Sequence, residues 1–434
     1  MTTTSDPKHP VYFDEADVRD ELTRVYDVCD GCRRCVELCT SFPTLFQMIA
    51  QHVDQDAGSL TPAEQDQVVD ECFQCKLCHL NCPYTPELHE WNIDFPRLML
   101  RADAMQHVNG IKSTRAKATT RLSGRTDLIG TLATSTGPLA NRIVNSEPGS
   151  RIRKVAARVT GVSSVRLLAP YAKQRFSTWF AKRQKIDIVE RQGHVTVFPT
   201  CHVEYQDTAI GKDLVRIYER NGIECNSTAA GCCGAPWLHS GNVEEFIEVA
   251  RKNIKTLAAE VRSGTDIVVP QPTCGYIIKK DYPDYVGGPD AELVAEHTYD
   301  AGEYLMRIHH GDDTSLDTDF PGDTVASITY HVPCHLRAQD IGFTSRDLME
   351  LTGADVELVQ HCSGIGARWG LRSGNEDISV PIAEQLGERS TEAGGDVVAG
   401  DCHCANTAII EQTGLIPQHP LQVLARAYGI DAEP

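Results

Sequence analysis

The sequence predicts a multidomain α+β protein, with a helical N-terminal domain followed by two pseudo-symmetric α/β repeats that contain parallel sheets. Three observations support this fold class. The N-terminal region combines two cysteine runs with helical apolar spacing. A strongly basic segment follows it. Short apolar strands then alternate with helices in two similar stretches, as in parallel sheets covered by helices. We expect domains over residues 1–110, 111–190, 191–312 and 323–430.

Length, charge and cysteine content narrow the class of protein. The chain has 434 residues and a formal net charge of −19, which argues against a nucleic-acid partner because phosphate binding needs a basic face. No apolar run approaches the roughly 18 residues that span a bilayer, and the first residues do not resemble a secretion signal, so we expect a cytoplasmic protein. Seventeen cysteines in that compartment indicate metal ligation rather than disulfides.

Two segments of the N-terminal domain carry helix signals. Between Asp14 and Val28, the residues Val18, Leu22 and Val25 share one helical face. Farther along, Thr61-Pro62-Ala63-Glu64 is a capping box with Pro at the first helical position, so a second helix should run from there to Cys72.

The two N-terminal cysteine runs share the spacing C-x2-C-x2-C-x3-C: Cys29, Cys32, Cys35 and Cys39, then Cys72, Cys75, Cys78 and Cys82. This spacing is typical of paired 4Fe-4S clusters, in which the fourth cysteine of each run binds the other cluster. One predicted cluster therefore takes Cys29, Cys32, Cys35 and Cys82, and the other takes Cys72, Cys75, Cys78 and Cys39. Two four-cysteine zinc sites are the alternative, although zinc motifs rarely have three cysteines at this spacing.

Residues 111–186 form the basic segment, with sixteen Lys and Arg against only Asp127 and Glu147. Two apolar stripes at helical spacing run through it: Ile152, Val155, Ala156 and Val159, then Ala172, Phe176, Trp179 and Phe180. Basic amphipathic helices can lie in the headgroup layer of an anionic membrane. An apolar stripe can equally pack on the rest of the protein. The sequence leaves both interpretations open, a peripheral membrane contact or a core face.

A second group of cysteines lies in the two α/β repeats. The first repeat has Cys201, Cys232, Cys233 and Cys274, with Cys201 and Cys274 expected at strand ends; the second has Cys334, Cys362, Cys402 and Cys404. Cys232 to Cys274 and Cys362 to Cys404 each span 42 positions, which supports an internal repeat. Because the carboxyl ends of parallel strands meet at one edge of a sheet, we expect a metal or redox site in the first repeat.

The second repeat has Ser363 where the first has Cys233. Its set is therefore a weaker cluster site, an open coordination position, or a relic that only shapes the interface. Of the remaining candidates, Cys225 should fill a core. Four histidines beside motif cysteines should support the sites rather than bind metal: His202, His335, His361 and His403. The run Gly364-Ile365-Gly366 lacks the context of a dinucleotide fingerprint, so no flavin or nicotinamide site is predicted.

The order of these motifs resembles the iron–sulfur subunits built from a 4Fe-4S dicluster domain and two cysteine-rich CCG domains, as in the families of the anaerobic glycerol-3-phosphate dehydrogenase C subunit and of heterodisulfide reductase. The resemblance covers nearly the whole chain. It implies a helical dicluster ferredoxin domain, and a further iron–sulfur cluster in the first CCG domain. The chain departs from the five-cysteine pattern of some CCG clusters at Gln271, three positions before Cys274, and at Ser363.

The resemblance also implies an oxidoreductase component rather than a stand-alone enzyme. Electrons would pass from a partner flavoprotein dehydrogenase, through two 4Fe-4S clusters and the CCG domains, to quinone or another acceptor. Such a subunit would work in the cytoplasm or on the cytoplasmic face of the inner membrane, and its catalytic residues are unknown. Two alternatives remain: a heterodisulfide or disulfide reductase with chemistry at a CCG cluster, and a soluble electron donor to a peroxide-reducing diiron protein.

Overall fold

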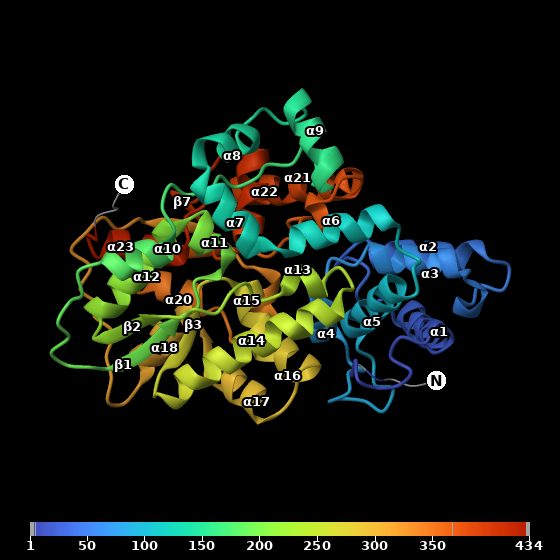
Figure 1. Cartoon of the computed structure of the whole chain (residues 1–434), viewed down its shortest axis with the longest axis horizontal. Coiled ribbons are helices and arrows are strands. Elements are labelled where there is room, and N and C mark those ends of the chain that lie inside the picture. The colour runs from blue at the N-terminus through green and yellow to red at the C-terminus, as the bar shows by residue number, and fades with distance from the viewer. Residues whose placement is uncertain (1–3, 5, 367, 431–434) are drawn as a thin grey trace.

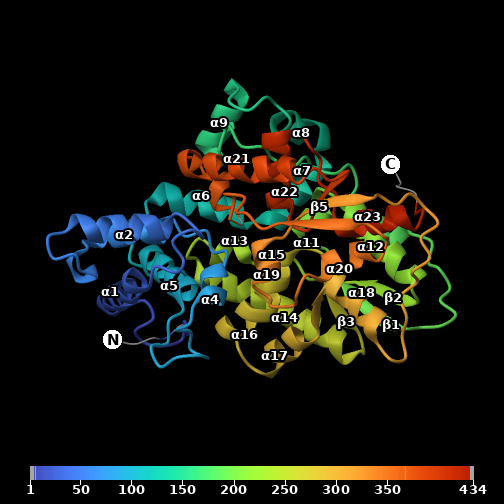
Figure 2. The same cartoon turned by 180° about the vertical axis from the view of Figure 1, so that it is seen from behind.

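Helices and two small parallel sheets make up the protein (Figures 1 and 2). The structure is a computed structural model that describes residues 4, 6–366 and 368–430. Residues 1–3 and 5, at the start of the predicted first domain, lie outside the described residues. The α+β class expected from the sequence is therefore confirmed. The N-terminal helices lie at one end of the molecule, and the two sheets lie toward the other.

The described residues of the N-terminal region form five α-helices: α1 (Glu15–Cys32), α2 (Ser41–Gln51), α3 (Pro62–Asp70), α4 (Leu77–Asn81) and α5 (Phe95–Val108). Asp14 caps α1, and the predicted capping box of Thr61 and Glu64 is present at the start of α3. Two predicted bounds were wrong. The first helix continues to Cys32, where Arg33 ends it in a left-handed conformation, and α3 ends at Asp70, before Cys72. The apolar faces of these helices share one core.

The basic segment is helical as well: α6 (Thr114–Gly124), α7 (Thr126–Ser135), α8 (Gly137–Val144), α9 (Arg151–Thr160) and α10 (Phe176–Lys182). Helices α8 and α9 form the outer edge of the molecule above α21 (Glu376–Glu392) and α22 (His403–Thr413) (Figure 1). In the part of the chain that the structure describes, no helix is long and apolar enough to cross a membrane.

The two apolar stripes of the basic segment differ in their surroundings. Phe176 of α10 is fully buried, and Trp179 and Phe180 pack against the same core. The interpretation of this second stripe as a membrane face was therefore wrong, because α10 lies against α11 (Thr200–Tyr205) and α12 (Thr208–Arg220). On α9, by contrast, Val155 is 60% and Val159 is 68% exposed.

The first sheet has the strand order β2-β1-β3-β4, with every pair parallel: β1 (Gly193–Val197), β2 (Ile223–Ser227), β3 (Asp266–Val269) and β4 (Thr298–Asp300). Between and after the strands run α11, α12, α13 (Ala235–Leu238), α14 (Val243–Arg262), α15 (Pro272–Tyr276), a π-helical turn (Ile277–Asp281), α16 (Tyr282–Tyr285), α17 (Pro289–Glu296) and α18 (Ala301–His310). Val197 pairs with both Ser227 and Val268, so the strands end level at one edge.

The second sheet repeats this plan with three strands in the order β6-β5-β7, again all parallel: β5 (Ser327–His331), β6 (Asp355–Val359) and β7 (Val397–Gly400). Its helices are α19 (Cys334–Arg337), α20 (Thr344–Glu350), α21, α22 and α23 (Pro420–Ala427), with a short 3-10 turn at Trp369–Leu371. Side chains from both repeats share one apolar core, in which α12 packs on α23 and α18 on α20.

Candidate metal centres

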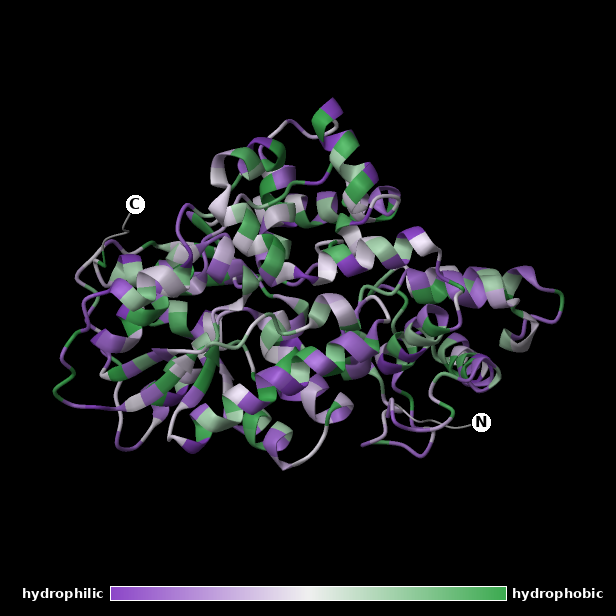
Figure 3. Cartoon of the chain, viewed as in Figure 1, coloured by the Kyte–Doolittle hydropathy of each residue, from purple (hydrophilic) through white to green (hydrophobic). Residues whose placement is uncertain are grey.

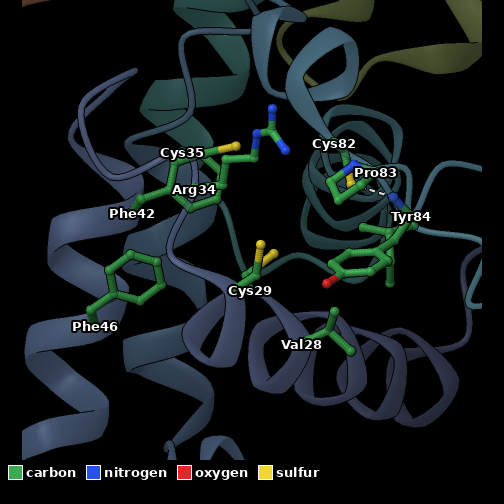
Figure 4. A pocket seen from close by; sticks show the side chains of 11 residues that line it. Val28, Cys29, Arg34, Cys35, Phe42, Phe46, Cys82, Pro83 and Tyr84 are labelled. Atoms are coloured by element: carbon green, nitrogen blue, oxygen red, sulfur yellow. Dashed lines mark hydrogen bonds between the residues drawn. The ribbon is translucent and has the colours of Figure 1, made fainter.

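One group of N-terminal thiols lines an open pocket, and we call this group the outer set: Cys29, Cys32, Cys35 and Cys82. Cys29 and Cys32 lie in the last turn of α1, and Cys82 ends α4. Figure 4 shows Cys29, Cys35 and Cys82 around this space, with Phe42, Phe46 and Tyr84 beside them. Asn81 donates a hydrogen bond to Cys35 at 3.7 Å, and the backbone N–H of Tyr84 donates to Cys82 at 3.4 Å.

The other four N-terminal thiols lie nearer the two repeats and form what we call the inner set: Cys72, Cys75, Cys78 and Cys39. Burial raises the pKa of the Cys39 thiol well above its usual range, and the nearby thiols of Cys75 and Cys72 raise it further. Cys39 thus faces the second run rather than its own. The loop between α3 and α4 holds two residues in left-handed conformations, Gln74 and Lys76. Gln74 donates a hydrogen bond to Cys72 at 3.4 Å.

The loop of the inner set packs on both α/β repeats. The ring of Phe73 lies 4.6 Å from that of Trp369 in the second repeat, and the Trp369 indole donates to the backbone carbonyl of Asp70. On the other side, Lys76 lies over the ring of Tyr276 in the first repeat. These contacts place the inner set between the outer set and the repeats.

The four cysteines of the first repeat lie just beyond the carboxyl ends of its strands. Cys201 and Cys274 are in the short helices α11 and α15, not at strand ends as predicted, because the chain turns directly into a helix after each strand. Cys232 and Cys233 lie in the loop after β2. Hydrogen bonds from the thiols of Cys201 and Cys233 hold the pKa of Cys232 well below its usual range. Cys233 also hydrogen-bonds Cys274, and Cys201 interacts with Cys274 as well, so the four thiols form one group.

Three polar side chains, of which Asn253 and Tyr282 are buried and Asp127 is half-buried, hold the Cys232–Cys233 loop, and sequence reasoning missed them. Asp127 of α7 accepts a hydrogen bond from the backbone N–H of Cys232 at 2.9 Å. Asn253 of α14 donates to the carbonyl of Cys232 at 2.9 Å, and the Tyr282 hydroxyl donates to that of Cys233 at 3.0 Å. One signal was available for Asp127, since it is one of only two acidic residues in the basic segment.

The cysteines of the second repeat have neighbours in two other thiol groups. Cys334 interacts electrostatically with Cys75 of the inner set and with Cys362 and Cys402. Cys404, by contrast, hydrogen-bonds Cys402 and also interacts with Cys274 of the first repeat. The second-repeat thiols therefore lie between the inner set and the first-repeat thiols. Among residues 4, 6–366 and 368–430, no three Cys, His, Asp or Glu side chains close on a point that a single metal ion could occupy.

The histidines beside motif cysteines join the two repeats to each other. His202 of the first repeat stacks on His403 of the second, with ring centres 4.1 Å apart. His403 also hydrogen-bonds Gln271 at 2.9 Å, and His335 hydrogen-bonds Thr273 at 3.1 Å. The Gln271 side chain therefore lies at the interface between the two repeats. Cys225 is 1% exposed in the core, as predicted.

Two crossed sets of four thiols beside two cysteine-rich α/β repeats define an iron–sulfur protein of the dicluster type. The family model of the 4Fe-4S dicluster domain matches residues 28–85, and that of the cysteine-rich domain named CCG matches residues 195–279 and 328–407. The chain therefore belongs to the iron–sulfur proteins that combine a 4Fe-4S dicluster domain with two CCG domains, and iron–sulfur electron transfer is the activity that these domains support.

Curated relatives come from two kinds of protein. The C subunit of anaerobic glycerol-3-phosphate dehydrogenase from Escherichia coli (strain K12) is 24% identical over 408 residues, which cover 83% of this chain and 99% of that protein. Lactate utilization protein A of Bacillus pumilus is 28% identical over 226 residues, 48% of this chain and 88% of that protein. The protein of the same name from Bacillus cereus (strain B4264) is 29% identical over 227 residues, 48% of this chain and 87% of that protein.

Proposed function

We propose that this chain is the electron-transfer subunit of a multi-subunit dehydrogenase, which receives electrons from a partner flavoprotein and passes them toward quinone or another acceptor. The observation that carries this proposal is the series of neighbouring thiol groups that runs through the molecule. The outer set leads to the inner set, Cys75 of the inner set faces Cys334 and Cys362, and Cys404 faces Cys274. A series of thiol groups in which each lies next to the following one is the arrangement that a relay needs.

The donor sets fit iron–sulfur clusters. We propose that the outer and the inner set each bind one 4Fe-4S cluster, and that the first-repeat set binds a further cluster. The second-repeat set is the weaker candidate, because Ser363 replaces one thiol. Clusters of this kind supply one-electron carriers whose reduction potential depends on nearby charges, hydrogen bonds and exposure. The cavity lined by four thiols and apolar side chains supports the outer assignment.

Affinity purification of the chain from its host under anaerobic conditions tests this function. We expect a flavin-containing protein to co-purify, and its substrate to generate the EPR signals of reduced clusters in the complex. The name of the relative that covers most of this chain, a subunit of a dehydrogenase, supports such a partner. Purification of the chain alone, without any flavoprotein and with clusters that no substrate reduces, would contradict the proposal.

A second candidate is a disulfide or heterodisulfide reductase, and the pair Cys402 and Cys404 favours it. Their thiols hydrogen-bond each other at the N-terminus of α22, where the Cys404 thiol and backbone N–H groups lower the pKa of Cys402. A dithiol with one activated sulfur can attack a disulfide. Turnover of a disulfide substrate by the purified chain with an artificial electron donor would favour this function over the relay.

We further propose that the exposed surface of α7 to α9 attaches the protein to the cytoplasmic face of the inner membrane. Large apolar side chains are exposed on all three helices: Leu128, Leu132, Leu139, Ile143, Ile152, Val155 and Val159. Exposed basic residues alternate with those of α9: Arg151, Lys154 and Arg158. Figure 3 shows the hydrophobic residues on the outer turns of α8 and α9. Basic and apolar side chains together match an anionic lipid surface.

Replacing Val155 and Val159 by glutamate should release the protein from anionic vesicles. Each basic residue near such a surface adds roughly 1 kcal/mol, and inserted apolar side chains add the part that salt does not screen. Sedimentation with phosphatidylserine-containing vesicles should show most of the bound fraction lost. The matched control, Val53→Glu with Ile416→Glu, changes two highly exposed apolar residues elsewhere and should bind normally. Equal binding by both double variants would exclude this surface as the contact.

A further inference from the structure

Two basic residues occupy the same position in the two N-terminal cysteine runs. Arg33 follows the second cysteine of the first run, and Lys76 follows the second cysteine of the second run. Both adopt the left-handed backbone conformation, with φ of 53° and 66°. Residues with a Cβ atom disfavour this conformation, and glycine adopts it freely. A strained non-glycine residue at both equivalent positions points to a role for the side chains.

The surroundings of these two side chains differ sharply. The Arg33 side chain is 57% exposed and forms an ion pair with Asp30 at 2.7 Å. Lys76 is 3% exposed, and its ammonium donates a hydrogen bond to the amide oxygen of Gln74 at 3.0 Å. None of the ion pairs between residues that the structure describes includes Lys76. A buried ammonium without a negative partner is costly, so a compensating charge is expected nearby.

The groups that face Lys76 show where that charge would be. His239 and His335 also lie near Lys76, and burial lowers the pKa of both, with a further lowering by the charge of Lys76. Burial raises the pKa of Asp281 to about 6, and the positive charge of Lys76 opposes that rise, so this carboxyl group is one neighbour that offsets the charge of Lys76. Cys72 and Cys75 of the inner set also lie near Lys76, and their thiols become anionic when they bind a metal.

We propose that Lys76 is a fixed positive charge that raises the reduction potential of the cluster bound by the inner set above that of the cluster bound by the outer set. The inference rests on the proposed function, because it requires that both sets bind clusters. Gain of one electron from the partner adds one negative charge and requires no proton. Lys76 stabilises that added charge across a buried, weakly screened distance. Water and Asp30 weaken the same effect of Arg33 on the outer set.

The consequence is that electron transfer from the outer to the inner cluster is favoured over transfer in the opposite direction. An electron that enters at the outer set is stabilised at the inner set, next to Cys334 and Cys362 of the second repeat. Lys76 acts through its charge on the cluster of the inner set and touches no substrate, so it is not a catalytic residue. Its role therefore has to be measured as a potential and not only as a loss of activity.

Redox titration followed by EPR on the anaerobically purified full chain tests this inference. Lys76→Met should shift one midpoint potential to a more negative value, whereas Lys76→Arg should retain the wild-type potential. Arg33→Met is the matched control, at the same motif position but exposed and ion-paired, and should leave both potentials nearly unchanged. Repeating Lys76→Met in a Cys82→Ser background, where only the inner cluster is expected, assigns the shifted potential.

Lys76→Gly separates the charge from the fold of the loop. Glycine fits the left-handed conformation, so this variant should keep the wild-type iron content and still show the lower potential. Wild-type potentials in both the Met and the Gly variants would overturn the proposal, as would an equal shift in Arg33→Met. Loss of iron in both variants, with retention in Lys76→Arg, would also overturn it, because the charge would then serve binding. A wild-type chain without iron would instead refute the proposed function.

Discussion

Cys29→Ser and Cys82→Ser, made together, should remove no more iron than either change made alone. The two residues are 53 positions apart in sequence, yet both line the outer cavity. If they bind the same cluster, the first substitution already destroys it, so the second has nothing further to remove. Each single variant and the double variant should therefore lose about four iron atoms, the content of one 4Fe-4S cluster.

The double variant Cys29→Ser with Cys72→Ser is the matched comparison. It combines one residue of the outer set with one of the inner set, so it should lose about eight iron atoms and all signals of paired clusters. Iron and acid-labile sulfide per chain, with EPR of the reduced protein, measure both outcomes. If each run bound its own cluster, Cys29 and Cys82 would belong to different clusters. The double variant Cys29→Ser with Cys82→Ser would then lose about eight iron atoms instead of about four. Stoichiometric zinc in anaerobically prepared protein would contradict either arrangement.

The local features of the N-terminal region could be predicted because they depend on short stretches of sequence. Capping by Thr61 and Glu64, the helical face of Val18 and Leu22, and the spacing of each cysteine run involve residues within a few turns of one another. The structure brings Cys39 near Cys72 and Cys75, and its ligation with the second run stays a prediction from the same spacing. Burial could not be predicted in this way, and it is burial that distinguishes Lys76 from Arg33.

The parts that sequence reasoning missed depend on contacts between distant segments. Asp127 holds the loop of Cys232 although 105 positions separate them, and no periodicity links the two. The stripe containing Trp179 and Phe180 has the same pattern as a membrane-binding helix, because an apolar face looks alike whether a core or a lipid surface covers it. Only the position of α10 against α12 distinguishes the two cases.

The strands of the two repeats could be predicted from the sequence, but the neighbours of each cysteine in the folded protein could not. Alternation of apolar strands with helices indicated two parallel sheets, and the 42-residue spacing indicated that they are related. The different neighbours of Cys402 and Cys404 arise at the N-terminus of α22, where Cys402 lies before the helix and Cys404 inside its first turn. Such a difference has no counterpart in the spacing of the motif.

Cys233→Ser should abolish any iron beyond that of the outer and inner sets, whereas Ser363→Ala should change little. Cys233 contacts Cys232 and Cys274, so it lies within the group of first-repeat thiols. A serine hydroxyl stays protonated near neutral pH and binds iron poorly compared with a thiolate, as is expected for Ser363 in the second repeat. The Ser363 hydroxyl instead accepts a hydrogen bond from the backbone N–H of Ile365 at 3.4 Å.

Cys225→Ser is the matched control for this prediction. Cys225 is buried in the first repeat but faces its apolar core, so the same substitution should lower stability and leave the iron content unchanged. Iron analysis and EPR of the three full-length variants give the ranking. Loss of iron or activity in Ser363→Ala, with none in Cys233→Ser, would make the second repeat the working site and its serine a ligand or a catalytic hydroxyl. The opposite ranking assigns the extra cluster to the first repeat and leaves the second repeat as the contact between it and the inner set.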